Sequence, residues 1–144
     1  MTDYIARAER DIAAPPETVW GILTAPGPHP EIMFGATIES TWSVGDRITW
    51  SGEWEGKPYE DHGVIVDIEP GRLLRVTHFS PLTGQEDVPG NYHQLEYTLT
   101  PYKSGTHVEL SQSNNPTAEA AEHSAANWRT MLDGLASVAE RSSR

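Results

Sequence analysis

The chain closes on NWRTMLDGLASVAER (127–141), and this segment decides how the rest of the chain must fold. Its large apolar side chains recur at helical spacing and form one stripe, made of Trp128, Met131, Leu132, Leu135, Val138 and Ala139. Such a stripe is typical of a helix that buries one side. Asn115 followed by Pro116 is a favourable helix start, and Arg141 near the end suits the helix dipole. We therefore predict a helix from about Pro116 to Arg141, on the order of 39 Å long.

The residues before this helix alternate between apolar and polar positions, as strands do. In RITWSGEW (47–54), Ile48 and Trp50 share one face, while Thr49 and Ser51 share the other. Short turns rich in Gly and Pro separate the alternating segments, which favours an antiparallel meander. The predicted strands of this meander are 36–42, 47–54, 59–68, 73–79, 92–100 and 106–113.

The N-terminal part of the chain adds one strand and one helix to this meander. Residues 4–12 (YIARAERDI) predict a first strand, and the second proline of APPETVWGIL predicts a short helix from Pro16 to Leu23. APGPHPE (25–31) then interrupts regular structure, and a second short helix at 28–34 is left open. The element order β-α-β-β-β-β-β-β-α predicts an α+β domain whose two helices lie against one face of a six- or seven-stranded sheet.

Composition and charge restrict the class of protein. A length of 144 residues fits one domain covering 1–144. The net charge of −11 disfavours nucleic acid and anionic membrane as partners. The absence of cysteine excludes disulfides and thiolate chemistry, and no apolar run reaches the roughly 20 residues of a membrane span. The N-terminus lacks an apolar signal core, so we expect a cytoplasmic protein.

Polar residues indicate which face of each strand points inward. Arg75 and Thr77 outside place Val76 and His78 inside, and the same reasoning assigns His93, Tyr97 and Gln112 to the inner face. In 59–68, outward Asp61 and Asp67 place His62, Val64, Val66 and Ile68 inside, although Ile65 then points outward and a bulge would switch the assignment. A close-packed core excludes unpaired polar groups, so inward polar residues near strand ends indicate a partly hydrated pocket.

The pocket lies, on this interpretation, between the sheet and the upstream half of the last helix. Ala121 and Ala125 are small and leave room there, although small residues equally fit close packing on the sheet. The predicted lining consists of Trp50, Val64, Val66, Val76, His78, His93, Tyr97, Gln112, Ala121, Ala125 and Trp128. The loop 80–91 is long enough to be a lid or to be disordered at its tip.

Two histidines are the best catalytic candidates, ahead of a general-acid pair among the carboxylates around the Gly56 hairpin (Glu53, Glu55, Glu60 and Asp61). His78 and His93 flank the 80–91 loop at matching strand ends, and a histidine near neutral pKa can act as acid or base. A metal site of His62, His78 and His93 is disfavoured, since a catalytic zinc needs three convergent ligands and a second shell. We therefore predict no metal and no cofactor.

Three stretches resemble a known family: AAPPETVWGILT, GVIVDIEPGRLLRVTH and the closing NWRTMLDGLASV. They are similar to the START-like, or SRPBCC, helix-grip superfamily, the fold of the birch-pollen allergen. Within it they most resemble the bacterial branch related to the C-terminal domain of the heat-shock-protein-90 ATPase activator. The resemblance implies a strongly curved antiparallel sheet that grips the C-terminal helix around a cavity. Relatives often carry a tryptophan after a second short helix, where EIMFG (31–35) offers Met33 and Phe34 instead.

The expected function is binding of a hydrophobic small molecule that is polyketide-like, aromatic or lipid-like. The first alternative is a polyketide cyclase- or hydrolase-type enzyme that uses His78 and His93. A further alternative is a chaperone-associated, stress-response interaction module. A homodimer is left open, and the sequence names neither the ligand nor a reaction.

Overall fold

The computed structural model describes residues 4–25, 36–81 and 84–142. These residues include two helices and seven strands, together with a 3₁₀ turn at Pro89–Asn91. The elements are β1 (Tyr4–Ile12), α1 (Pro16–Leu23), β2 (Thr37–Ser40), β3 (Arg47–Trp54), β4 (Lys57–Glu69), β5 (Leu73–His78), β6 (His93–Tyr102), β7 (Gly105–Asn115) and α2 (Ala118–Ser142). The predicted element order is confirmed, while the segment 28–34 and the residues Met33 and Phe34 lie outside the described residues.

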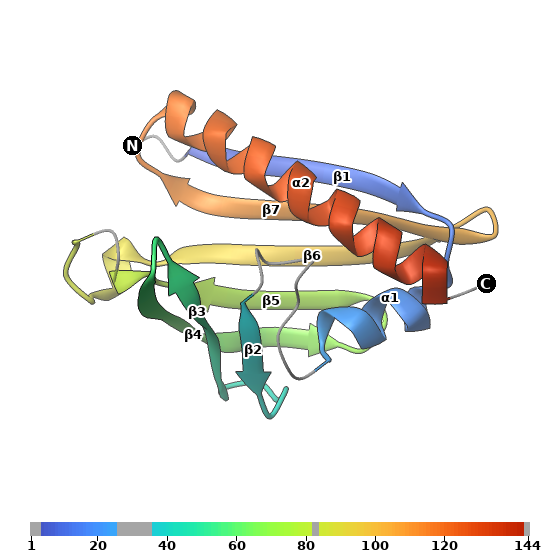
Figure 1. The fold of residues 1–144 in the computed structure, drawn as a ribbon, viewed down its shortest axis with the longest axis horizontal. Coiled ribbons are helices and arrows are strands. Elements are labelled where there is room, and N and C mark those ends of the chain that lie inside the picture. The colour runs from blue at the N-terminus through green and yellow to red at the C-terminus, as the bar shows by residue number, and fades with distance from the viewer. Residues whose placement is uncertain (1–3, 26–35, 82–83, 143–144) are drawn as a thin grey trace.

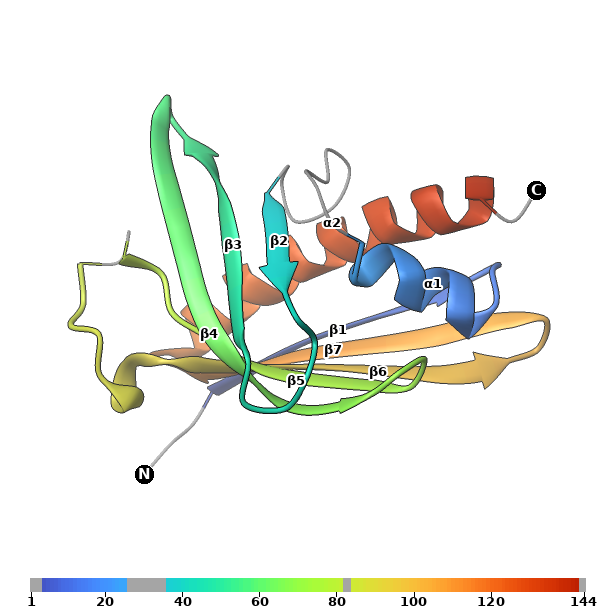
Figure 2. The same cartoon turned by 90° about the horizontal axis from the view of Figure 1, so that it is seen from below.

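One antiparallel sheet contains all seven strands, in the order β1-β7-β6-β5-β4-β3-β2. Helix α2 lies along β1 and β7, and α1 packs beside the C-terminal end of α2 (Figure 1). Figure 2 shows that β2, β3 and much of β4 turn away from the other strands and stand as a wall beside the helices. The sheet is therefore strongly curved, and both helices occupy its concave face.

The curvature is concentrated in β4. This strand pairs with β3 from Lys57 to Val64 and with β5 from Ile65 onward, with a register shift between Ile65 and Asp67. Gly63 lies so close to β5 that an added Cβ would be 1.8 Å from the carbonyl oxygen of Thr77. No side chain fits there, so a glycine permits the close approach that bends the sheet.

The inward assignment of Val64 and Val66 is wrong. Val64 is 43% exposed and Val66 38% exposed, while Ile65 is 1% exposed and belongs to the core. Val66 is the extra residue at the register shift between Ile65 and Asp67, and the shift inverts the direction of every residue before it. Asp61, rather than His62, therefore faces the concave side.

Helix α2 is the centre of the core. Its buried residues are Ala121, Ala125, Met131, Leu132, Leu135, Ala136 and Ala139, and Trp128 and Val138 are partly buried. The predicted cap is wrong by two residues. Thr117 accepts a hydrogen bond from the backbone N–H of Ala120 at 3.0 Å, whereas the buried Asn115 amide donates to the carbonyl oxygens of Tyr4 and Gln112. Asn115 thus holds the start of β1 against the end of β7 and is not free to cap the helix.

Replacement of Gly63 tests the origin of the bend. Gly63→Ala should lower the free energy of unfolding by about 2 kcal/mol or more, because the new methyl group meets backbone rather than a movable side chain. Gly21→Ala in α1 is the matched control, since nothing lies within 4 Å of its added Cβ. The control should gain up to about 1 kcal/mol from helix propensity. Urea denaturation measures both, and equal stability of Gly63→Ala and wild type would contradict the prediction.

Candidate ligand-binding site

Strand pairing brings four polar or aromatic side chains together on the concave face. Trp50 of β3 is paired with Asp61 of β4, and His78 of β5 with His93 of β6. Cross-strand partners point to the same face of a sheet. The Trp50 and His78 rings meet edge-on with centroids 4.8 Å apart, and the His78 and His93 centroids are 6.2 Å apart. The two histidines singled out in the sequence are therefore direct neighbours.

Asp61 and His78 form a hydrogen-bonded pair in this group. The His78 Nε2 atom lies 2.9 Å from Asp61 Oδ2, and the two side chains are only 19% and 14% exposed. Their remaining polar atoms, His78 Nδ1 and Asp61 Oδ1, are buried and have no hydrogen-bond partner among the described residues. An ionised carboxylate only accepts, so Nε2 carries the proton that it donates to Asp61. In the neutral form of His78, Nδ1 then carries a lone pair without a donor in the described part of the chain.

Asp61 is the site residue that the sequence interpretation missed. Polarity alone assigns its carboxylate to the outer face. The length of the turn between β3 and β4, however, predicts that it points inward. Glu55 and Gly56, with φ of 51° and 80°, form a two-residue turn that pairs Trp54 with Lys57. Counting back from that turn pairs Trp50 with Asp61, so an inward Trp50 requires an inward Asp61.

His93 and Gln112 connect the site to β7 and α2. The His93 Nδ1–H donates to the carbonyl oxygen of Ser113 at 2.8 Å, which fixes the orientation of the ring. The buried Gln112 accepts a hydrogen bond from the indole Nε1–H of Trp128 at 2.5 Å. Trp128 is thus tied to the sheet by a polar contact as well as by packing.

Ala121 and Ala125 lie against the sheet. Both are buried in a small cluster with Ala6 of β1, and Tyr4 and Trp128 pack at its margin. Small residues on the helix meet a small residue on the strand, which lets the two backbones come close. The structure thus places these alanines in the close-packed arrangement that was the alternative in the sequence interpretation.

His62 belongs to a different cluster on the other face of β4. Its Nε2 atom lies 2.9 Å from Asp87 Oδ2 and 3.0 Å from the Tyr92 hydroxyl, and the Tyr92 ring stacks on Phe79. The Tyr92 hydroxyl donates to Asp87, and this hydrogen bond and that from His62 lower the pKa of the Asp87 carboxyl. His62 cannot converge with His78 and His93, because neighbouring strand residues point to opposite faces.

An apolar cavity lies beside Trp50, deeper under the helices. It has a volume of about 10 Å³, roughly one water molecule, and is lined by Leu23, Ile38, Trp42, Ile48, Trp50, Leu74, Val76, Tyr97 and Met131. Burial of Tyr97 in this region raises the pKa of its hydroxyl strongly. Three predicted lining residues, Trp50, Val76 and Tyr97, are therefore brought together here.

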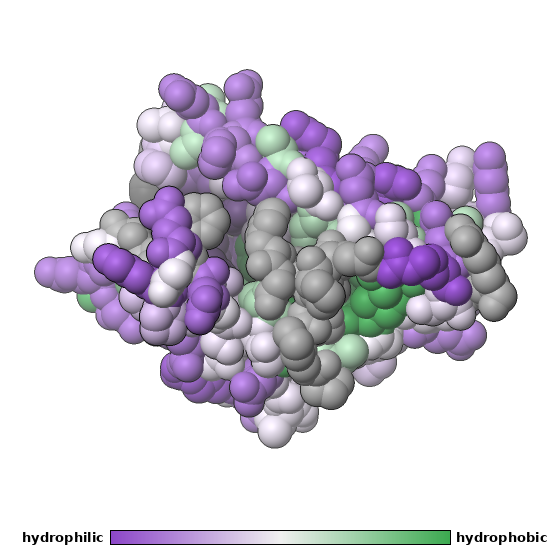
Figure 3. Space-filling model, in the orientation of Figure 1, coloured by the Kyte–Doolittle hydropathy of each residue, from purple (hydrophilic) through white to green (hydrophobic). Residues whose placement is uncertain are grey.

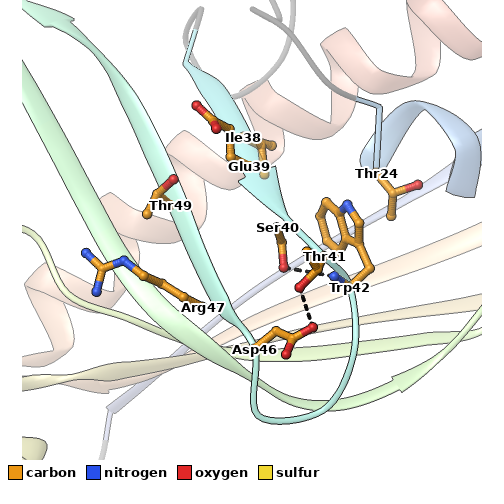
Figure 4. Close-up of a pocket in the computed structure, with 9 residues that line it drawn as sticks. All are labelled: Thr24, Ile38, Glu39, Ser40, Thr41, Trp42, Asp46, Arg47 and Thr49. Atoms are coloured by element: carbon orange, nitrogen blue, oxygen red, sulfur yellow. Dashed lines mark hydrogen bonds between the residues drawn. The ribbon is translucent and has the colours of Figure 1, made fainter.

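An open hollow of about 810 Å³ lies outside this cavity, along β2 and the β2–β3 turn. Figure 4 shows Thr24, Ile38, Glu39, Ser40, Thr41, Trp42, Asp46, Arg47 and Thr49 around it. Ile38 and Trp42 line both spaces, so they separate the hollow from the cavity. Trp42 has a φ of 59°, which is rare for a bulky residue, and its N–H donates to Ser40 Oγ at 3.0 Å.

The outer surfaces of the two helices differ in hydropathy. Figure 3 shows hydrophilic residues over the outward side of α2 and a hydrophobic patch over α1. None of the described helices is long and apolar enough to span a membrane.

A separate ionisable cluster occupies the outer face of β1 and β7. His107 Nδ1 lies 2.6 Å from Asp11 Oδ1, and its Nε2 lies 3.7 Å from Glu9 and 3.5 Å from Glu109. The hydrogen bond to Asp11 and the three nearby carboxylates raise the pKa of His107, against a smaller effect of burial. Protonated His107 therefore stabilises the folded state.

Comparison with known proteins identifies the family. The family model described as "Activator of Hsp90 ATPase homolog 1-like protein" matches residues 13–140. The chain belongs to this family. The resemblance found in the sequence is thus confirmed. None of the curated proteins with which the chain was compared matches it.

Solved structures show the same fold. ChR145 from Cytophaga hutchinsonii is 47% identical, with a TM-score of 0.81 and coverage of 96% of this chain and 94% of that one. Ara h 8.0201 is 12% identical, with a TM-score of 0.71 and coverage of 96% and 98%. The Aha1 dimer from Colwellia psychrerythraea is 19% identical, with a TM-score of 0.69 and coverage of 97% of each chain. The activator-like chain therefore has the α+β helix-grip fold of the START-like superfamily.

Titration of His107 gives a testable dependence of stability on pH. Because its folded pKa is raised, its contribution is fully present below the unfolded pKa of about 6.5 and is lost as pH rises through the folded pKa. His107→Gln should therefore be less stable than wild type at pH 6, by about 1 kcal/mol or less for so exposed a cluster, and the difference should shrink by pH 9.

Urea denaturation across this pH range measures the effect. His123→Gln, on the exposed side of α2, is the control for the removal of a histidine. A constant difference between His107→Gln and wild type would contradict the assignment.

Proposed function

We propose that this chain binds a hydrophobic small molecule, polyketide-like, aromatic or lipid-like, between the curved sheet and α2. The observation that carries the proposal is the apolar cavity that Trp50, Val76 and Tyr97 line. Ile38 and Trp42 separate it from an open hollow on one side. On the other side, the Trp50 ring reaches the polar group at His78. An apolar chamber with polar groups at one end is the usual design of a small-molecule site.

Binding requires the cavity to open. Its volume of about 10 Å³ is far below that of a ligand pocket, which is on the order of 300–1,000 Å³. Trp42 is the weakest part of the wall, since it is only partly buried and its backbone conformation is strained. Displacement of its side chain would join the cavity to the hollow of about 810 Å³. A ligand therefore enters past Trp42 and occupies the space that the indole vacates.

A neutral apolar dye, N-phenyl-1-naphthylamine, tests the proposal by fluorescence titration. Trp42→Ala should bind the dye several-fold more tightly, because the wall is removed. Ile38→Trp should bind it several-fold more weakly, because the larger side chain fills the cavity. Val44→Trp is the matched control on the exposed turn, where Val44 is 62% exposed, and should bind like wild type.

Native mass spectrometry of freshly purified protein supplies the second measurement. A co-purifying apolar molecule is expected, and it should be reduced in Ile38→Trp. Absence of any such molecule, together with no dye binding by wild type or Trp42→Ala, would overturn the proposal.

Proton transfer is the second candidate function, of cyclase or hydrolase type. The direct pairing of His78 with His93, and the carboxylate of Asp61 on His78, favour it, because an imidazole oriented by a carboxylate is a general base. With a p-nitrophenyl ester as probe, His78→Ala should abolish turnover while the apolar dye still binds. His62→Ala should retain turnover, since its ring lies on the other face of β4. Undiminished turnover by His78→Ala would exclude this candidate.

Association with other proteins stays a prediction from the sequence. The words "activator of Hsp90 ATPase" and "dimer" describe the family's namesake and the Colwellia structure. None of the residues described here favours a chaperone or a second copy as partner. Ligand binding is therefore the function that we put forward.

A further inference from the structure

The Asp61–His78 pair contains two buried polar atoms that nothing in the described structure satisfies. They are His78 Nδ1 and Asp61 Oδ1. A buried polar atom without a partner costs roughly 1–3 kcal/mol, and native proteins pair nearly all of them. A pair that served only to hold β4 against β5 would gain nothing from these two atoms. Their position indicates that a partner arrives from outside the chain.

The protonation state decides which kind of partner fits. Asp61 accepts the proton on His78 Nε2 at 2.9 Å, so neutral His78 offers Nδ1 as an acceptor. Protonation of Nδ1 would instead bury an N–H without an acceptor. The atom that fits Nδ1 is therefore the hydrogen of a donor group on a ligand.

The surroundings of Nδ1 favour an aromatic or similarly flat ligand. The Trp50 ring stands edge-on to His78 at 4.8 Å, and the His93 ring lies 6.2 Å away at an interplanar angle of 30°. Val76, on the same face of β5 and about 7 Å further along the strand, lines the apolar cavity. A flat apolar body in the cavity would thus bring a terminal donor to His78.

Charge disfavours an anionic ligand. The carboxylate of Asp61 lies next to His78, and the chain carries a net charge of −11. A carboxylate ligand would be repelled and would have no proton to donate. An ether of the same shape would also have none. A neutral, weakly acidic hydroxyl satisfies both requirements.

We propose that the Asp61–His78 pair is the polar anchor of the binding site, and that its ligand is a phenol or enol whose hydroxyl donates to His78 Nδ1. Asp61 is a positioning residue, which holds the proton on Nε2 and so keeps Nδ1 free. This inference rests on the proposed function and specifies the class of ligand. It also explains why a carboxylate lies on the concave face.

Three matched probes test the inference at pH 7: 2-naphthol, 2-methoxynaphthalene and 2-naphthoate. In wild type, 2-naphthol should bind about tenfold more tightly than the ether, the effect of one hydrogen bond to a buried acceptor, and 2-naphthoate should bind most weakly. His78→Gln and Asp61→Asn should both bring the ratio of the naphthol and ether affinities close to one.

The second His–Asp pair supplies the control variants. His62 and Asp87 have the same 2.9 Å separation but lie on the other face of β4. His62→Gln and Asp87→Asn should therefore keep the tenfold ratio. A ratio lost equally in these controls would overturn the inference, because it would reflect general destabilisation.

Nitrogen NMR of wild type provides a measurement that needs no variant. The two ring nitrogens of His78 should show the Nε2–H tautomer, and 2-naphthol should shift Nδ1 while 2-methoxynaphthalene does not. Equal binding of naphthol and ether would overturn the inference and leave the proposed function intact. An Nδ1 chemical shift that does not change when naphthol is added would do the same. Failure of all three probes and of the apolar dye would overturn the proposed function itself.

Discussion

The concave face of this protein depends on the close approach of β4 to β5 at Gly63. Because position 63 carries no side chain, the backbone of β4 can lie against the Thr77 carbonyl group, and Val64 N–H donates to Thr77 Oγ1 at 2.9 Å. The sheet bends there, and β2 and β3 turn toward the helices. A flat sheet would leave Trp50 and Asp61 far from α2. The bend thus curves the seven-stranded sheet around the helices.

The contacts between α2 and the sheet differ between the two halves of the helix. Met131, Leu132 and Leu135 are almost completely buried and fix the C-terminal half of the helix on the core. Towards the N-terminal half the contact changes to alanines on Ala6 and a hydrogen bond between Trp128 and Gln112. The polar row of Asp61, His78 and His93 lies beyond the apolar cavity. The helix therefore closes a core at one end, and the sheet presents polar groups at the other.

Family and fold do not determine the chemistry of this face. The chain belongs to the activator-like family, and structures as little as 12% identical have the same helix-grip fold. A fold shared at that level is a scaffold, and function must be argued from the site. Here the site consists of a histidine held by a carboxylate and flanked by an indole. That arrangement, rather than the fold, is the reason that we propose a hydroxyl-bearing aromatic ligand.

The sequence by itself determined the element order, the amphipathic stripe of α2 and the inner faces of β5, β6 and β7. These follow from local periodicity, which the core enforces on every strand that it covers. The sequence also predicted that His78 lies beside His93, because both residues stand at the strand ends that one loop connects. Only the tertiary structure decided the direction of β4, since a single register shift after Ile65 reverses all the residues before it. Val64 consequently faces outward and Asp61 faces His78, and Val66, at the shift itself, is also exposed. The packing of the small alanines of α2 on Ala6 is a tertiary contact as well. Local patterns give each strand a period, but only the pairing between strands decides which face is buried.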